Sequence, residues 1–141
     1  MKRSKRMACL TVLLMIGAAV ACGGGGKYAS AKSLIAKQID IMNHYADAME
    51  KAGNAQDVAA ALNAYAAETR DLVPAMKKFQ AEFPEMKNQA EPPAELKPEM
   101  DKMQAVMGRI INASMKAAQY MQDPLVQEAQ KKLGEAMSGM K

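Results

Sequence analysis

The sequence predicts an all-α protein, an up-down antiparallel helical bundle of three long helices and a short C-terminal fourth. Half of the 141 residues are hydrophobic, yet only 4% are aromatic and tryptophan is absent. Good helix formers such as alanine, methionine, lysine and leucine outnumber the β-branched and aromatic residues that favour strands. Apolar residues after the first 27 positions recur at steps of three and four, the period of an amphipathic helix. A chain of this length forms one ordinary domain.

The first expected helix covers Tyr28 to Met49, where apolar residues recur at helical spacing. These positions are Tyr28, Ala31, Ile35, Met42, Tyr45 and Met49, widened by Leu34 and Ile39. Gly53 and Asn54 follow, and glycine commonly ends a helix whereas asparagine commonly caps the next one. The two residues therefore predict a short turn between two helices.

The second expected helix carries apolar positions that alternate steps of four and three. They are Val58, Leu62, Tyr65, Thr69 (the one polar member), Leu72, Met76, Phe79 and Phe83. This spacing is typical of helices that cross at a shallow angle. Pro74 predicts a kink or a break, because proline lacks the backbone donor and clashes with the preceding turn. Pro84 ends the helix, and residues 84–97, with three prolines, form a linker.

The third expected helix begins near Pro98, which suits a first helical turn. Its predicted core positions are Met100, Met103, Met107, Ile110, Ser114, Ala117 and Met121. Asp123 and Pro124 predict an N-cap and the start of a short fourth helix. One side of that helix carries Leu125, Ala129, Leu133, Ala136 and Met137. We expect the fourth helix to cover part of one groove of the bundle.

The N-terminal segment has the pattern of an export signal. Basic side chains at Lys2, Arg3, Lys5 and Arg6 precede the apolar stretch Met7–Val20. A helix of that length spans about 21 Å, short of the roughly 30 Å of a bilayer core, so cleavage after export is predicted. Removal of residues 1–21 leaves 15 basic and 15 acidic residues, although the whole chain has a net charge of +4. The mature domain therefore has no basic excess that would indicate nucleic acid as a partner.

The sequence Ala19-Val20-Ala21-Cys22 resembles the lipobox of bacterial lipoproteins. The resemblance covers only the first 26 residues, and Ala19 stands where the family usually has leucine. It implies cleavage between Ala21 and Cys22, a diacylglyceryl group on the Cys22 thiol, and an N-acyl chain such as palmitate on the new amino group. The alternative is an ordinary secretory signal, which would be cut at the same bond.

This interpretation divides the chain into a cleaved signal peptide (1–21), a lipidated cysteine with a glycine-rich tether (22–28) and a helical bundle domain (29–141). Gly23 to Gly26 give the tether a flexible backbone, and its reach is about 15 Å. The resemblance implies a protein of the bacterial cell envelope that faces the periplasm. The outer membrane is favoured, because Gly23 replaces the aspartate that tends to retain lipoproteins in the inner membrane. The expected partners are the bilayer, through Cys22, and an envelope protein or lipid.

The spacing of Met100, Met103 and Met107 resembles the thioether arrays of exported copper-handling proteins. Soft sulfur ligands select Cu(I), and this spacing puts all three side chains on one helix face. The alternative function is therefore a periplasm-facing protein that binds or buffers Cu(I). The same positions fall on the predicted core, where methionine is a common filler, and we favour core packing.

Other candidate chemistry is sparse. His44 is the only histidine, and although Asp40 and Asp47 flank it, a lone histidine makes a poor metal site. We expect it to point outward into a weak ion pair. The serines have no nucleophile context, and the glycine run lies in the tether rather than in a phosphate-binding loop. The sequence predicts a binding or structural domain that is not an enzyme and has no cofactor besides the acyl groups on Cys22.

Overall fold

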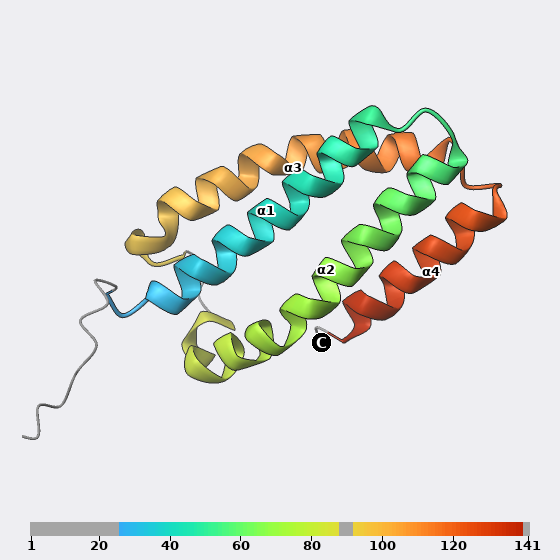
Figure 1. Cartoon of the computed structure of the whole chain (residues 1–141). Helices are drawn as coiled ribbons and strands as arrows, with labels where there is room; N and C mark the ends of the chain where they lie inside the picture. The colour runs from blue at the N-terminus through green and yellow to red at the C-terminus, as the bar shows by residue number, and fades with distance from the viewer. Residues whose placement is uncertain (1–25, 88–91, 140–141) are drawn as a thin grey trace, which may run out of the picture.

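The computed structural model describes residues 26–87 and 92–139, and these fold as an all-α bundle (Figure 1). The elements are α1 (Ala29–Lys51), α2 (Ala55–Glu82), the short 3-10 helices η1 (Pro84–Lys87) and η2 (Ala94–Leu96), α3 (Lys97–Ala118) and α4 (Pro124–Ser138). The first three α-helices have 22 to 28 residues and the fourth has 15, so three long helices and a short fourth are confirmed. The predicted signal segment, with Ala21 and Cys22, lies outside the described residues.

The four helices pack in the spatial order α3, α1, α2, α4. Helices α1 and α3 run in the same direction and α2 and α4 run in the opposite direction, which gives the expected up-down arrangement (Figure 1). Helix α4 lies along α2 and does not fill a groove between α1 and α3. Helices α3 and α4 are therefore the two outer members of the row.

Local capping explains where two helices begin. The Asn54 side chain accepts a hydrogen bond from the Asp57 backbone at 2.9 Å, and the Asp57 side chain accepts one from Gly53 at 3.0 Å. The Asp123 side chain accepts from the Leu125 backbone at 2.9 Å, directly before α4. These bonds satisfy amide groups that have no partner in the first helical turn. The predicted N-caps are confirmed.

Pro74 does not break α2, which runs from Ala55 to Glu82 with the proline inside it. The proline side chain is exposed, whereas Leu72 beside it is buried. Helix α2 packs against both α1 and α4. Tertiary packing of this kind supplies most of the stability of a protein helix. It therefore offsets the free energy lost with the one backbone hydrogen bond that proline cannot donate.

The core consists of two clusters of buried side chains. The larger one collects residues from all four helices near the turns that join α1 to α2 and α3 to α4, and its largest members are Tyr45, Met49, Val58, Leu62 and Val126. The smaller cluster lies at the other end and joins α1 to the end of α2 and to η2 through Ala31, Ile35, Phe83 and Leu96. Most of the predicted core positions of α1 and α2 are buried, and the others are half-buried.

The predicted core positions of α3 and α4 are confirmed only in part: Ala117, Ala129 and Ala136 are buried, and Met103, Ile110 and Leu133 are half-buried. The buried residues of α3 are Val106, Ala113 and Ala117, and those of α4 are Val126, Ala129 and Ala136. Several predicted core residues are exposed instead: Met100, Met107, Ser114, Met121, Leu125 and Met137. The reason is that valine and alanine, being small, let α3 and α4 approach their partner helices closely. Within the described ranges, no helix is both long and apolar enough to cross a membrane.

Candidate functional site

Helix α3 carries a second apolar stripe beside its buried one. Met107, Ile111 and Met115 follow one another at intervals of four, so they lie on one face of the helix, and all three are exposed. Val106 precedes Met107 by one residue and points about 100° away around the helix, into the core. The outward stripe of α3, defined as Met100, Met107, Ile111 and Met115, is thus apolar surface that the described chain leaves partly exposed, from 37% at Met100 to 65% at Met115.

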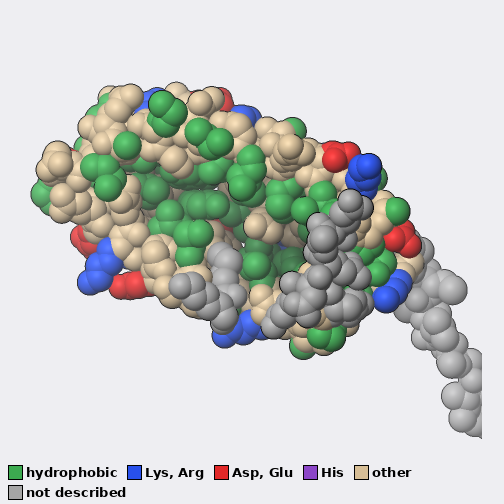
Figure 2. Space-filling view, turned by 180° about the vertical axis from the view of Figure 1, so that it is seen from behind, with side chains coloured by type: hydrophobic (Ala, Val, Ile, Leu, Met, Phe, Trp, Pro, Cys, Tyr) green, Lys and Arg blue, Asp and Glu red, His purple; other side chains and the backbone are tan. Residues whose placement is uncertain are grey.

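The stripe belongs to a larger apolar area. Figure 2 shows hydrophobic side chains gathered around a hollow on one face of the molecule, with charged side chains mainly at its edge. In the described part of the chain, the large hydrophobic residues that remain exposed come from α3, the α3–α4 turn and α4; they are Met100, Met107, Ile111, Met115, Met121, Leu125 and Met137. Apolar areas with a polar rim are typical of surfaces that bind another protein or a membrane.

An open pocket lies against the first half of α3. Its volume is about 520 Å³, and it is lined by Pro92, Lys97, Met100, Asp101, Met103, Gln104 and Met107. The structure therefore brings the three methionines of the predicted thioether array to one pocket. Met103 is half-buried against the smaller core cluster, whereas Met100 and Met107 reach solvent.

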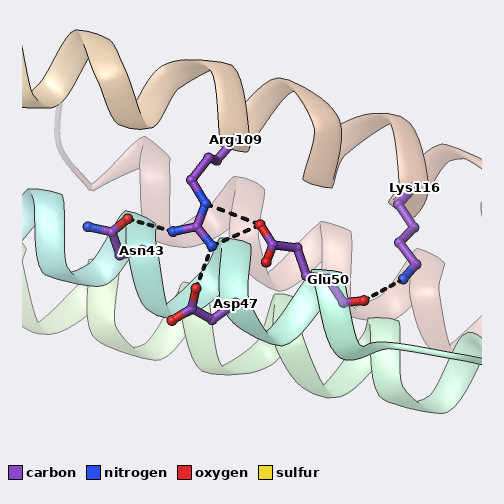
Figure 3. A network of polar contacts seen from close by, with 5 residues as sticks. All are labelled: Asn43, Asp47, Glu50, Arg109 and Lys116. Carbon is purple, nitrogen blue, oxygen red and sulfur yellow. Dashed lines mark hydrogen bonds and ion pairs between the residues drawn. The ribbon is translucent and has the colours of Figure 1, made fainter.

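The opposite edge of α3 is fixed to α1 by Arg109 (Figure 3). Its Nη1 donates to Asn43 Oδ1 at 2.9 Å, its Nη2 donates to Glu50 Oε1 at 2.8 Å, and Nη2 also bonds Asp47. About two turns further on, Lys116 donates to the backbone oxygen of Glu50 at 3.1 Å. We call these five residues the α1–α3 clamp.

The clamp explains which way α3 faces. Arg109 is the only charged residue between Lys102 and Lys116, so turning it toward α1 leaves the other exposed side chains of this stretch uncharged. The hydrogen bond from Arg109 holds the pKa of the Asp47 carboxyl below its ordinary value, and the hydrogen bond to Asp47 raises the pKa of the guanidinium. Both shifts favour the charged pair. The clamp thereby holds the methionines on the outward side of α3.

His44 is exposed, as the sequence predicted, with 67% of its side chain accessible. Its Nδ1 lies 3.3 Å from Glu68 Oε2 on α2, so its hydrogen-bond partner is Glu68 rather than Asp40 or Asp47. Across the described ranges, no three His, Cys, Asp or Glu side chains gather in a way that could hold a metal ion.

Sequence reasoning missed the clamp, although a signal existed. Asn43, Asp47 and Glu50 follow at intervals of four and three on the expected first helix, which places them on one face. The matching partner was Arg109, the one charged residue between Lys102 and Lys116 in the sequence. The predicted lipidation site at Cys22 and the cleavage site at Ala21 lie outside the described residues.

In comparisons with protein-family models, with curated proteins and with solved structures, nothing matches this chain. Its function has to be inferred from its own residues. Two features bear on it: the lipobox-like sequence before Cys22 and the outward stripe of α3.

Proposed function

We propose that the chain is a lipid-anchored protein of the bacterial envelope whose helical domain is a non-catalytic binding module. The anchor is Cys22, supported by the preceding sequence Ala19-Val20-Ala21 and by the glycine run that follows. The binding surface is the outward stripe of α3. The observation that carries this part is the exposure of four large apolar side chains on one helix face, beside a hollow with charges mainly at its rim (Figure 2).

The partner we favour is an amphipathic helix of another envelope protein. The outward stripe, together with the polar Gln104, follows the spacing 100, 104, 107, 111 and 115, close to the alternation of four and three that lets two helices interlock. A helix that lies in an apolar groove uses the same spacing for its own anchoring side chains. Between Lys102 and Lys116 the outward side of α3 has no charged side chain, so no charge has to be buried when a partner helix binds there.

The direction of α1 and α3 orients the proposed surface. Helix α1 begins at Ala29, seven residues after Cys22, so an anchor at Cys22 would hold the first turn of α1 nearest to the membrane. Helix α3 begins at the same end of the bundle, because it runs in the same direction as α1 (Figure 1). The stripe would thus lead away from the membrane, from Met100 toward Met115, and a flexible tether of about 15 Å would keep the domain near the bilayer.

Metabolic labelling with a fatty-acid probe tests the anchor. We expect the wild type and the Cys9→Ala variant to be labelled and Cys22→Ala to remain unlabelled, because Cys9 lies in the segment that is cleaved. Lipidation at Cys22 holds the protein firmly only when more than one acyl chain is attached. Equal labelling of the Cys22 variant and the wild type would refute the anchor.

Site-specific photo-crosslinking in intact envelopes tests the surface. A photoreactive residue at Ile111 should give a discrete protein adduct, whereas one at Ala64, which is exposed on α2, should not. Adding Met107→Lys should remove the Ile111 adduct, because a buried unpaired charge is costly at an apolar contact. Identical adducts from both sites would contradict the proposal that the outward stripe is a specific binding surface. Adducts with lipid alone would show that the stripe binds lipid and not a protein.

Cu(I) binding is a second candidate function, favoured by the pocket that Met100, Met103 and Met107 line together. Thioethers are soft ligands that prefer Cu(I), and Met100 and Met107 can be reached from solvent. Lys97 and Asp101 both line the same pocket, so their opposite charges give it no net attraction for a bound cation. For that reason we place copper second.

Anaerobic Cu(I) titration against a competing chelator separates the two functions. The test compares the wild type with Met103→Leu/Met107→Leu, which nearly conserves volume and should fold normally. We expect no tight site in either protein. Tight binding by the wild type that disappears in the double variant would establish the copper function instead.

A further inference from the structure

The methionines of the described chain range from fully buried to largely exposed. Met42 and Met49 are buried, with 5% and 0% of their surface exposed. On α3, Met107 is 50% exposed, Met115 is 65% exposed and Met100 is 37% exposed. Methionine side chains are therefore exposed at three positions of α3, as well as at Met121 and Met137, and buried in the core.

Packing does not account for sulfur at the exposed positions. Leucine has a helix propensity similar to that of methionine and would give an equally apolar surface. Methionine differs in its reactivity, because its thioether takes up oxygen to form a sulfoxide, and reductases can reverse the change. Susceptibility to such oxidation follows exposure.

We propose that the exposed methionines of α3, Met100, Met107 and Met115, form a reversible oxidation site that consumes hypohalous acid while the helical core stays folded. With hypochlorous acid, each thioether forms one sulfur–oxygen bond and gives a sulfoxide, chloride and a proton. Sulfur loses two electrons and chlorine gains two. A dithiol then restores the thioether, yielding a disulfide and water, in the reaction of methionine sulfoxide reductases.

The fold tolerates oxidation at these positions because it does not depend on them. Helix α3 is held by Val106, Ala113 and Ala117 on its buried face and by Arg109 at its edge. A sulfoxide on the outward stripe stays hydrated, whereas one at Met49 would bury a polar group inside the larger cluster, at a cost in folding free energy. The site can thus take up several oxygen atoms before the core is affected.

The test is a titration of the purified full-length chain with hypochlorous acid, followed by peptide mapping of each methionine and by thermal melting. We expect Met107 and Met115 to be oxidised about ten-fold or more faster than Met49, with the helical melt unchanged at that stage. A methionine sulfoxide reductase with dithiothreitol should restore the thioethers. Equal rates for Met49, loss of the melt with the first sulfoxides, or failure of the reductase would each overturn the proposal.

The variant Met100→Leu/Met107→Leu/Met115→Leu tests whether the site protects the core. It keeps the apolar surface and nearly the same volume, so it should melt like the wild type before oxidation. We expect its Met49 to be oxidised at a lower dose of oxidant than in the wild type, since three of the five exposed thioethers of the described residues are gone and only Met121 and Met137 still compete. The single variant Met115→Leu should show a smaller change in the same direction. If the wild type and both variants tolerate the same dose, the proposed protective function is refuted.

Discussion

Helix α1 contacts its two neighbours, α2 and α3, through different kinds of side chain. Toward α2 it presents aromatic and aliphatic side chains, and Tyr45 stacks on Tyr65 with ring centres 4.6 Å apart. Toward α3 it presents Asn43, Asp47 and Glu50, which bind Arg109 at the exposed edge, whereas the buried contact surface of α3 consists of valine and alanine.

This difference predicts that the α1–α2 contact stabilises the domain more than the α1–α3 contact does. Burial of large apolar side chains is the main stabilising contribution in a core, whereas exposed ion pairs contribute little and are weakened by salt. We therefore expect the α1–α2 pair to be the stable centre of the domain and α3 to be the helix that opens first. Helix α3 is also the helix that carries the exposed methionines, so its attachment matters for every proposed function.

The largest effect is expected from Tyr45→Ala, at the centre of the α1–α2 contact. Tyr45 is buried, and its loss removes a stacked ring and leaves a cavity. We expect the free energy of unfolding to fall by about 3–5 kcal/mol, as for other buried aromatic residues, measured by chemical denaturation. His44→Ala, the exposed neighbouring position, is the matched control and should change it by less than about 0.5 kcal/mol. Similar losses in both variants would show that the contact is not a stable centre.

A medium effect is expected from Ala113→Leu, on the buried face of α3. The added atoms have no room in the larger cluster and would push α3 away from α1, which costs about 1–3 kcal/mol. Ala118→Leu, at an exposed position of the same helix, is the control and should be nearly neutral. A neutral Ala113→Leu variant would mean that α3 packs loosely and that the clamp alone holds it.

Arg109→Gln is expected to have a smaller effect on global stability. Its main effect should be local, on the stability of α3. The change removes the bonds to Asp47 and Glu50 and leaves the core intact. Hydrogen exchange should become faster in α3 than in α2, because local opening of α3 requires less free energy. If exchange rises equally in both helices, the clamp acts on the whole domain and not on α3.

The smallest effect on the stability of the domain is expected from the loss of the Asp47 contribution at low pH. The pKa of Asp47 is lowered in the folded state by its hydrogen bond with Arg109, so its contribution to stability is present above the ordinary pKa of aspartate and is lost as the pH falls through the lowered value. Denaturation at about pH 6 and about pH 3 should show a smaller acid loss for Asp47→Asn than for the wild type. An equal loss in both proteins would show that other carboxylates account for the whole effect.

The sequence predicted the features of this fold that are set locally. The caps at Asn54 and Asp123 depend on side chains that bond to backbone two or three residues away, so the sequence contains both partners. The core positions of α1 and α2 were found because each helix has a single apolar stripe with large residues such as Tyr45 and Leu62.

The register of α3 could not be predicted in the same way. This helix has two neighbouring apolar stripes, one with Met107 and one with Val106, and methionine ranks as the larger apolar residue. Which stripe is buried depends on how closely α1 can approach and on where Arg109 finds its carboxylates, and both are properties of the assembled domain. Met100 and Met107 of the outward stripe were therefore mistaken for core, whereas Ala117 was placed there correctly.

The parallel course of α1 and α3 has a consequence for the order of folding. The hydrogen bonds that join the two helices link residues 59 to 66 positions apart, whereas His44 and Glu68, between α1 and α2, are 24 apart. Closing a longer loop costs more chain entropy, so nearer contacts tend to form earlier. We expect the α1–α2 hairpin to assemble first and to serve as the template on which α3 docks. Until Arg109 reaches its partners on α1, the rotation of α3 is not fixed, and either of its apolar stripes can face the hairpin.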